Sequence, residues 1–121
     1  MTSRPVAATV NLEKMAMVSR ETIRKAVDVL RLTASPRKII LFGSYAAGAA
    51  RDDSDLDLLV VEDQVEDIPA EMVRLMRALS PLRIPAEVVV IRTSDFDEWS
   101  TVPGTVYWDA ARTGEVLFDA A

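Results

Sequence analysis

The sequence predicts an α/β (α+β) fold, a small mixed β-sheet flanked by helices. Short apolar runs bounded by proline, glycine or charged residues predict four strands, at residues 38–42, 56–61, 86–91 and 116–118. Between these runs lie segments whose apolar residues recur at helical spacing. The alternation of the two kinds of segment favours helices packed on a sheet, although it does not determine the order of the strands.

The first helix is predicted from apolar residues at positions i, i+3, i+4 and i+7, which are Ile23, Ala26, Val27 and Leu30. This pattern predicts a helix over about residues 12–33 that can break near Ser19. Asn11 and Ser19 are candidate caps, because short polar side chains accept hydrogen bonds from the free N–H groups of a first helical turn. Pro36 ends the helix, since the residue before a proline avoids helical backbone.

Glycine and proline mark the boundaries in the middle of the chain. Gly43-Ser44 turns the chain after the first strand into a short helical turn that stops at Gly48, and a polar loop follows at residues 49–54. An acidic linker at residues 62–67 precedes Pro69, which suits the first turn of a helix. The apolar stripe of that helix is Met72, Leu75, Met76 and Leu79.

The C-terminal third predicts two more helices. Thr93 begins a short helix after the third strand, and residues 103–113 are expected to be helical, with Gly114 at the C′ position. Together these elements predict a flexible N-terminal tail at residues 1–10 and a single domain at residues 11–121.

The composition excludes several kinds of chemistry. The chain has 121 residues, no cysteine, no histidine and a formal net charge of −5. Disulfides, zinc sites of the usual ligand types, thiol nucleophiles and imidazole bases are therefore excluded. The acidic balance and the lack of a basic face argue against direct nucleic-acid or membrane partners. No apolar run is long enough to span a bilayer and no signal peptide is recognised, so we expect a cytoplasmic protein.

Two aspartates open the second predicted strand. Asp55 and Asp57 occupy alternate positions, so both side chains project to the same side. Two such charges repel each other by about 4 kcal/mol at an effective dielectric of about 20, and a divalent cation between them removes that cost. Glu87 has the equivalent place on the third strand and can complete a three-carboxylate cluster if the two strands are neighbours. Oxygen ligands alone favour Mg²⁺ or Mn²⁺, and three carboxylates would hold two Mg²⁺ ions.

The Gly43-Ser44 turn predicts a phosphate site beside these carboxylates. Its backbone N–H groups and the Ser44 hydroxyl are donors suited to phosphate oxygens. Arg51 is either a further phosphate ligand or a surface residue, and Ser54 either contacts ligand or braces the loop. Tyr45 is expected to pack against the sheet rather than to stack on a base. The candidate nucleotide-binding residues are therefore Gly43, Ser44, Arg51 and Ser54, and the candidate catalytic and metal-binding residues are Asp55, Asp57 and Glu87.

Gly43-Ser44, ten residues and then Asp55-x-Asp57 resemble the signature of the DNA polymerase β-like nucleotidyltransferase superfamily. The run from Gly104 to Phe118 resembles the minimal nucleotidyltransferase (MNT) branch of that superfamily, and the similarity extends from about Pro36. The resemblance implies the polymerase β-like nucleotidyltransferase fold and a role as antitoxin to a separately encoded, all-helical HEPN toxin, an RNase. It also implies Mg²⁺-dependent transfer of AMP from ATP onto that toxin, commonly at a tyrosine.

The resemblance assigns phosphate contact to Ser44, Mg²⁺ to Asp55 and Asp57, and the third carboxylate position to Glu87. The sequence departs from the pattern at Glu87, where relatives typically have aspartate, and at Ala47, where they often have arginine. These departures keep open a second reading, a binding module that neutralises a helical partner by contact alone. A transferase acting on a small molecule or an RNA end is a third reading. Both homo-oligomers and hetero-oligomers remain compatible with the sequence.

Overall fold

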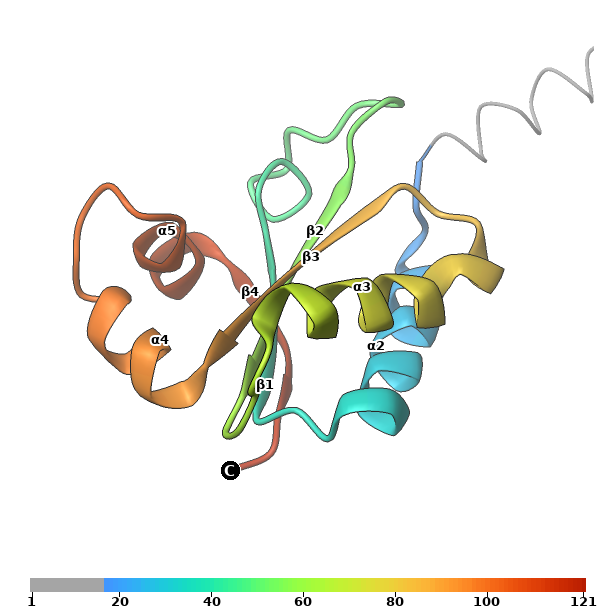
Figure 1. The fold of residues 1–121 in the computed structure, drawn as a ribbon. Helices are drawn as coiled ribbons and strands as arrows, with labels where there is room; N and C mark the ends of the chain where they lie inside the picture. Colours follow the sequence, from blue (N-terminus) through green and yellow to red (C-terminus); the bar gives the residue numbers. More distant parts are fainter. Residues whose placement is uncertain (1–16) are drawn as a thin grey trace, which may run out of the picture.

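The computed structural model describes residues 17–121 and contains the predicted helices and strands (Figure 1). In chain order they are α2 (Arg20–Ala34), β1 (Lys38–Phe42), β2 (Leu56–Glu62), α3 (Ile68–Leu79), the short 3₁₀ helix η1 (Ser80–Leu82), β3 (Ala86–Arg92), α4 (Thr93–Trp99), α5 (Val106–Thr113) and β4 (Glu115–Asp119). The α/β class with a small sheet flanked by helices is therefore confirmed.

The sheet is mixed, as predicted, and its strand order is β3-β2-β1-β4. Strands β2 and β3 are parallel, whereas β1 pairs in antiparallel fashion with both β2 and β4. The parallel pair needs a crossover connection, which α3 and η1 supply. In this register Asp57 lies opposite Phe42 on one side and Glu87 on the other. The two strands that carry the candidate carboxylates are neighbours, which is the condition that a shared site requires.

Helices cover both faces of the sheet. Helices α2 and α3 lie on one face and α4 and α5 on the other (Figure 1). Successive residues of the central strands alternate between two apolar clusters. Leu58 and Val60 join the cluster under α2 and α3, and Leu59 and Val61 join the cluster under α4 and α5. Burial on both faces explains why the strands read as continuous apolar runs rather than as alternating ones.

Helix α2 begins later than the predicted range of 12–33. Ser19 is its N-cap and accepts a hydrogen bond from the Thr22 N–H at 3.1 Å, so the expected break at Ser19 is the actual start. The cap Asn11, the helical residues predicted before Met17 and the tail at 1–10 lie outside the described residues. At the other end Ser35 adopts a left-handed φ of 51°, which turns the chain toward β1.

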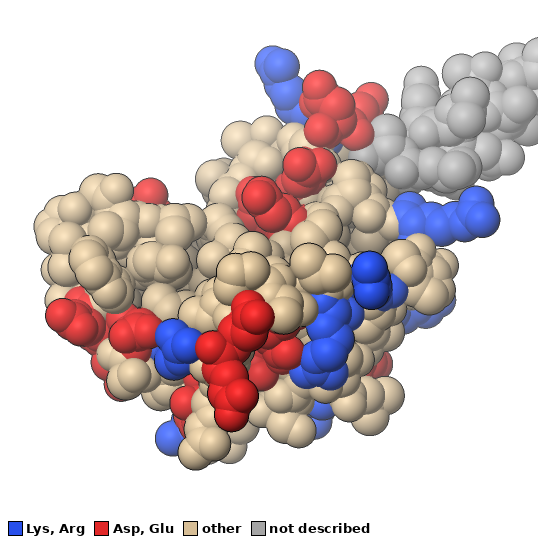
Figure 2. Space-filling model, in the orientation of Figure 1, with Lys and Arg blue, Asp and Glu red and all other residues tan. Residues whose placement is uncertain are grey.

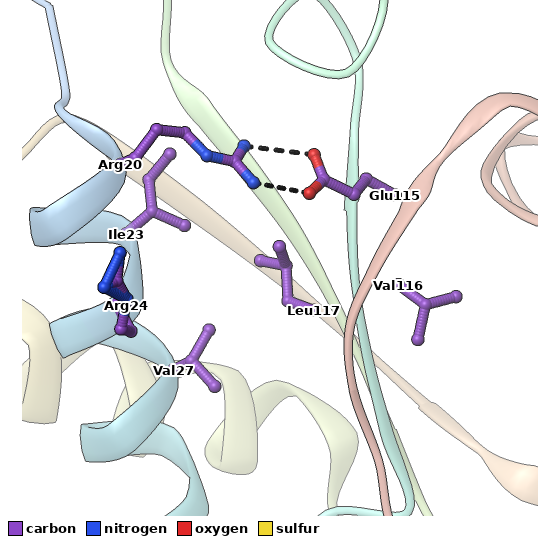
Figure 3. A pocket seen from close by; sticks show the side chains of 7 residues that line it. All are labelled: Arg20, Ile23, Arg24, Val27, Glu115, Val116 and Leu117. Carbon is purple, nitrogen blue, oxygen red and sulfur yellow. Dashed lines mark hydrogen bonds and ion pairs between the residues drawn. The ribbon is translucent and has the colours of Figure 1, made fainter.

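Side chains connect α2 to the edge strand β4. Arg20 donates to both carboxylate oxygens of Glu115, at 3.0 and 2.5 Å (Figure 3). Further along, the Arg31 guanidinium lies 4.4 Å from the centre of the Phe118 ring. Because Arg20 and Glu115 are both solvent-exposed, this ion pair orients the two elements and adds little to the stability of the fold.

The last predicted helix is shorter than the expected range of 103–113. Gly104 has a positive φ of 91°, so the chain turns there, and α5 starts only at Val106. Its N-cap is Thr105, whose hydroxyl accepts from the Trp108 N–H at 3.1 Å. Within residues 17–121, no helix combines the length and the apolar character that a membrane crossing requires.

Candidate active site

Three carboxylates stand at one edge of the sheet. Asp57 and Glu87 are paired in register on the parallel strands β2 and β3, near the point where each strand begins. Asp55 precedes β2 by one residue and is exposed, as is Glu87, whereas Asp57 is partly buried. Because β2 and β3 run in the same direction, residues near the start of each meet at the same edge. The sequence left the order of the strands open, and the structure shows that the second and third strands are neighbours.

Asp57 lies at the electrostatic centre of this group. Its pKa is raised above the ordinary value, first by burial and then by the negative charges of Glu87 and Asp55. A hydrogen bond with the Glu87 carboxyl raises the Asp57 pKa further, because it favours the protonated form. Without a bound cation, the ionised form of Asp57 is therefore disfavoured. A cation, or a proton shared with Glu87, would remove the repulsion.

The turn after β1 closes directly over Asp57. Gly43 has a positive φ of 74°, and a Cβ built on it would collide with the Asp57 carboxylate, whose Cγ would lie only 3.1 Å away. Glycine is required here both by the backbone conformation and by the approach of this carboxylate. The Ala47 N–H donates to the Gly43 carbonyl at 3.1 Å, and the Ala49 N–H donates to the Ser44 carbonyl at 2.9 Å, which makes the predicted single helical turn.

Free backbone donors remain at the start of that turn. In the part of the chain that the structure describes, the N–H groups of Ser44, Tyr45 and Ala46 donate to no backbone carbonyl. Such unpaired N–H groups at the start of a helical turn are donors for anionic oxygens. The turn therefore offers donors at the same edge of the sheet where the carboxylates offer acceptors.

Ser54 has a structural role in the loop between the turn and β2. The Ser54 hydroxyl accepts a hydrogen bond from the Arg51 N–H at 2.7 Å, and the Ser54 N–H donates to the Arg51 carbonyl at 3.0 Å. Ser54 thus braces the loop, which was one of the two predicted roles. The Arg51 side chain is exposed, and acidic side chains gather over this loop at the top of Figure 2, where Asp52 and Asp53 are also exposed.

The donor set suits a hard divalent cation, because the candidate ligands at this edge are carboxylate oxygens. The electrostatics also suit one, since Asp57 is strained by two like charges. Asp55 contributes through its charge, however, and residues 17–121 contain no group of three Asp or Glu side chains already closed around one point. Asp57 and Glu87 form the core of the site, with Asp55 beside them.

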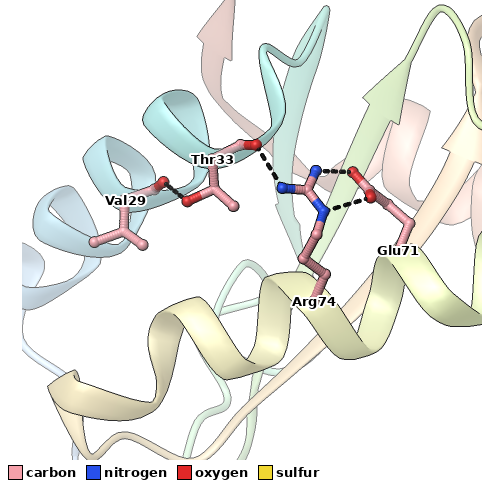
Figure 4. A network of polar contacts seen from close by, with 4 residues as sticks. All are labelled: Val29, Thr33, Glu71 and Arg74. Atoms are coloured by element: carbon pink, nitrogen blue, oxygen red, sulfur yellow. Dashed lines mark hydrogen bonds and ion pairs between the residues drawn. The ribbon is translucent and has the colours of Figure 1, made fainter.

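Sequence reasoning missed a second acidic cluster at the far end of β2. Glu62 was expected in an exposed linker, but it is the last residue of β2 and only 5% exposed. It lies with Glu71 and Arg74 of α3 beside a cavity of about 410 Å³. Arg74 donates to Glu71 at 2.9 and 2.8 Å and to the Thr33 carbonyl at 2.9 Å, which joins α3 to the end of α2 (Figure 4).

A further cavity, of about 230 Å³, lies between α2 and β4 and includes Arg20, Arg24 and Glu115 in its lining (Figure 3). None of the three candidate carboxylates lines either cavity. Because Asp55 and Glu87 are exposed, the candidate active site is open to solvent at this edge of the sheet.

Known proteins resemble this chain in sequence and in fold. The sequence matches the family described as "Polymerase beta, Nucleotidyltransferase" over residues 12–121. It is similar to the protein adenylyltransferase MntA of Thermococcus cleftensis, with 37% identity over 79 residues, which are 58% of this chain and 77% of the relative.

Solved structures share the fold. One is a toxin–antitoxin with AMP-PNP, with a TM-score of 0.59 and 21% identity over 79% of this chain and 73% of the other. Another is a tri-AMPylated HEPN toxin of Shewanella oneidensis in complex with an MNT antitoxin, with a TM-score of 0.56 and 20% identity over 83% and 71%. The match over nearly the whole chain means that this protein belongs to the polymerase β nucleotidyltransferase family, and it is a nucleotidyltransferase.

Proposed function

We propose that this chain is a Mg²⁺-dependent protein adenylyltransferase that transfers AMP from ATP to a helical HEPN toxin and thereby acts as its antitoxin. The observation that carries the proposal is the position of Asp57, which lies between Glu87 and the Gly43 turn. A metal-binding carboxylate and a set of phosphate donors thus meet at one edge of the sheet. The name of the MntA relative and the two toxin–antitoxin structures support the choice of AMP and of a protein acceptor.

The proposed reaction is a displacement at the α-phosphorus of ATP. The acceptor hydroxyl oxygen loses its proton to solvent and forms a bond to the α-phosphorus, the bond from that phosphorus to the bridging oxygen breaks, and pyrophosphate leaves. Mg²⁺ held by Asp55, Asp57 and Glu87 would neutralise phosphate charge and lower the pKa of the attacking hydroxyl. The N–H groups and the hydroxyl at Ser44 would orient the phosphates, and Arg51 would add positive charge at the loop.

A protein acceptor fits the open form of the site. The carboxylates stand at a sheet edge, two of them exposed, and the described residues form a single small domain around one sheet. A second polypeptide can therefore reach Asp57 and Glu87 without any rearrangement of a lid. We propose that the HEPN partner supplies the acceptor side chain and forms a hetero-oligomer with this chain.

The test is AMP transfer in the presence of Mg²⁺, α-labelled ATP and the co-purified helical partner, followed by mass analysis. The wild-type chain is expected to add AMP to the partner. Asp57→Asn is expected to lower the rate by at least about 100-fold, because it removes a charged ligand of the proposed Mg²⁺. Asp53→Asn, a change in the neighbouring exposed loop, is the matched control and retains wild-type transfer. Equal labelling by Asp57→Asn and wild type would refute the assignment.

A second function is favoured by Glu87, which is one methylene longer than the aspartate typical of relatives, and by the absence of arginine at Ala47. In that case the chain blocks its partner by stoichiometric contact without chemistry. Growth rescue separates the two functions. Asp57→Asn fails to rescue cells from the toxin if AMP transfer is required, and it rescues them fully if contact suffices.

A further inference from the structure

Tyr45 ties the phosphate turn to the start of α2. It directly follows Ser44, and its hydroxyl accepts a hydrogen bond from the backbone N–H of Val18 at 3.0 Å. Val18 is 8% exposed and immediately precedes Ser19, the N-cap of α2. This bond joins two segments that are 27 residues apart in sequence. Since a buried N–H needs an acceptor, the hydroxyl and not only the ring is fixed in place.

The Tyr45 ring lies on the opposite face of the sheet from the carboxylates. It is partly buried against the apolar cluster under α2 and α3, which includes Val18 and Ile23. Asp57, by contrast, shares the strand face of Leu59 and Val61, the face that α4 and α5 cover. The turn therefore passes over the end of the sheet, from the carboxylate face at Gly43 to the α2 face at Tyr45.

The turn is consequently fixed at two points. At Gly43 the backbone rests against the Asp57 carboxylate, and at Tyr45 the side chain is bonded to the start of α2. Among the described residues, no backbone carbonyl accepts from the N–H groups of Ser44, between these two points, of Tyr45 itself or of Ala46, which directly follows. Loss of either point would let those donors move relative to Asp57.

We propose that Tyr45 is a positioning residue that aligns the phosphate donors of the turn through its hydroxyl bond to the Val18 backbone. This inference rests on the proposed function and assigns to α2 a part in nucleotide binding. Loss of the Tyr45 bond should affect phosphate binding selectively, because the donors of the turn would bind the phosphates of the nucleotide and not its base or ribose. Misalignment weakens the binding of a triphosphate more than that of a monophosphate.

The experiment measures the affinity of the whole chain for Mg²⁺·AMP-PNP and for AMP by calorimetry, in wild type and in Tyr45→Phe. The variant keeps the ring and loses only the hydroxyl. We expect its Kd for Mg²⁺·AMP-PNP to rise roughly three- to tenfold, the scale of one lost hydrogen bond, and its Kd for AMP to change by less than about twofold. Thr33→Val, which removes a hydroxyl bonded to the Val29 carbonyl at the other end of α2, is the control and changes neither Kd.

The outcomes separate this inference from the proposed function. If the wild type binds Mg²⁺·AMP-PNP and Tyr45→Phe binds it equally well, the inference fails while the proposed function stands. If both Kd values rise together, in line with a fall in Tm, Tyr45 supports the fold alone and the inference also fails. If the wild type does not bind Mg²⁺·AMP-PNP at all, the proposed function fails and the inference falls with it.

Discussion

The carboxylate of Asp57 occupies the space where a side chain at Gly43 would begin. This contact brings together the two halves of the sequence motif, the glycine–serine turn and the paired aspartates, across the antiparallel pair β1 and β2. The spacing of ten residues between Ser44 and Asp55 is the length of chain that leaves β1, makes the turn and returns as β2. The motif is thus a hairpin-like connection that sets the donors we propose for phosphate against the carboxylate we propose for the metal.

Gly43→Ala should abolish AMP transfer. The new methyl group must displace the Asp57 carboxylate, and the positive φ adds roughly 1–2 kcal/mol of backbone strain. We expect transfer to fall by at least about 100-fold, the scale seen when one preorganised electrostatic contact is lost. Labelling with α-labelled ATP measures the rate, and urea unfolding measures the stability.

Gly104→Ala is the matched control for Gly43→Ala. Gly104 also has a positive φ, of 91°, but a Cβ there meets no atom within 4 Å. This variant should lose comparable stability through strain alone and keep its transfer rate. Equal losses of activity in the two variants would show that strain, and not the contact with Asp57, limits the reaction.

Asp57→Asn should stabilise the protein in the absence of Mg²⁺ while it removes activity. The raised pKa of Asp57 reflects burial and repulsion by Glu87 and Asp55, and a neutral amide is free of both costs. The gain is up to about 1 kcal/mol, because solvent screens a partly exposed group. Thermal unfolding at pH 7.5 measures it.

With added Mg²⁺, the wild type should become more stable than Asp57→Asn. A cation that binds only the folded wild type raises its Tm by mass action, and the variant without the Asp57 charge gains less. A wild-type Tm that does not respond to millimolar Mg²⁺, with or without ATP, contradicts the assignment of a metal to this site.

The features of the site that could be predicted from the sequence are those that depend on neighbouring residues in the chain. The faces of Asp57 and Glu87 follow from the two-residue period of a strand, so each could be placed from sequence. Whether Asp57 and Glu87 lie side by side depends on whether their strands are neighbours. The sequence could not decide this, because strand order depends on packing across the whole sheet. The turn at Gly43 was predictable from its residue types, whereas the collision that makes glycine obligatory was visible only in three dimensions.

Glu62 shows the opposite case, in which a local pattern misled. Its acidic neighbours suggested a solvated linker, but the strand continues through it and α3 packs over it. Gly114 is a milder case. It does follow α5 as predicted, but with an extended φ of −73° instead of the left-handed conformation of a C′ glycine.

Gly114→Ala should destabilise the fold although the backbone there suits any residue. A Cβ would lie 2.6 Å from the Cγ2 atom of Ile40 and would also collide with the Ala110 carbonyl. Overpacking of this kind costs roughly 1–3 kcal/mol. Urea unfolding measures the loss. Gly48→Ala adds a methyl group in open space but at a positive φ of 72°, so it gives the cost of backbone strain without overpacking. A loss below about 1 kcal/mol for Gly114→Ala would mean that α5 moves aside easily.

Stability should fall as pH rises from about 5 to 8, owing to Glu62. Burial raises its pKa from 4.5 to about 8, and a hydrogen bond to Glu71 adds to the shift, while the charge of Arg74 opposes it. The folded protein therefore keeps a proton on Glu62 that the unfolded chain has already released. Since the native state binds more protons in this window, the free energy of unfolding decreases with pH, by at most about 1.4 kcal/mol per pH unit.

Glu62→Gln isolates the effect of Glu62 from that of Asp57, whose pKa is also raised. The amide keeps the shape of the protonated carboxyl and cannot ionise, so its unfolding free energy should change less between pH 5 and 8 than that of the wild type. Glu66→Gln changes an exposed carboxyl beside the same cavity and should leave the wild-type slope intact. Chemical denaturation at pH 5, 6.5 and 8 gives the three slopes. Parallel slopes for wild type and Glu62→Gln would mean that Glu62 is ionised in the fold, with its charge balanced by Arg74.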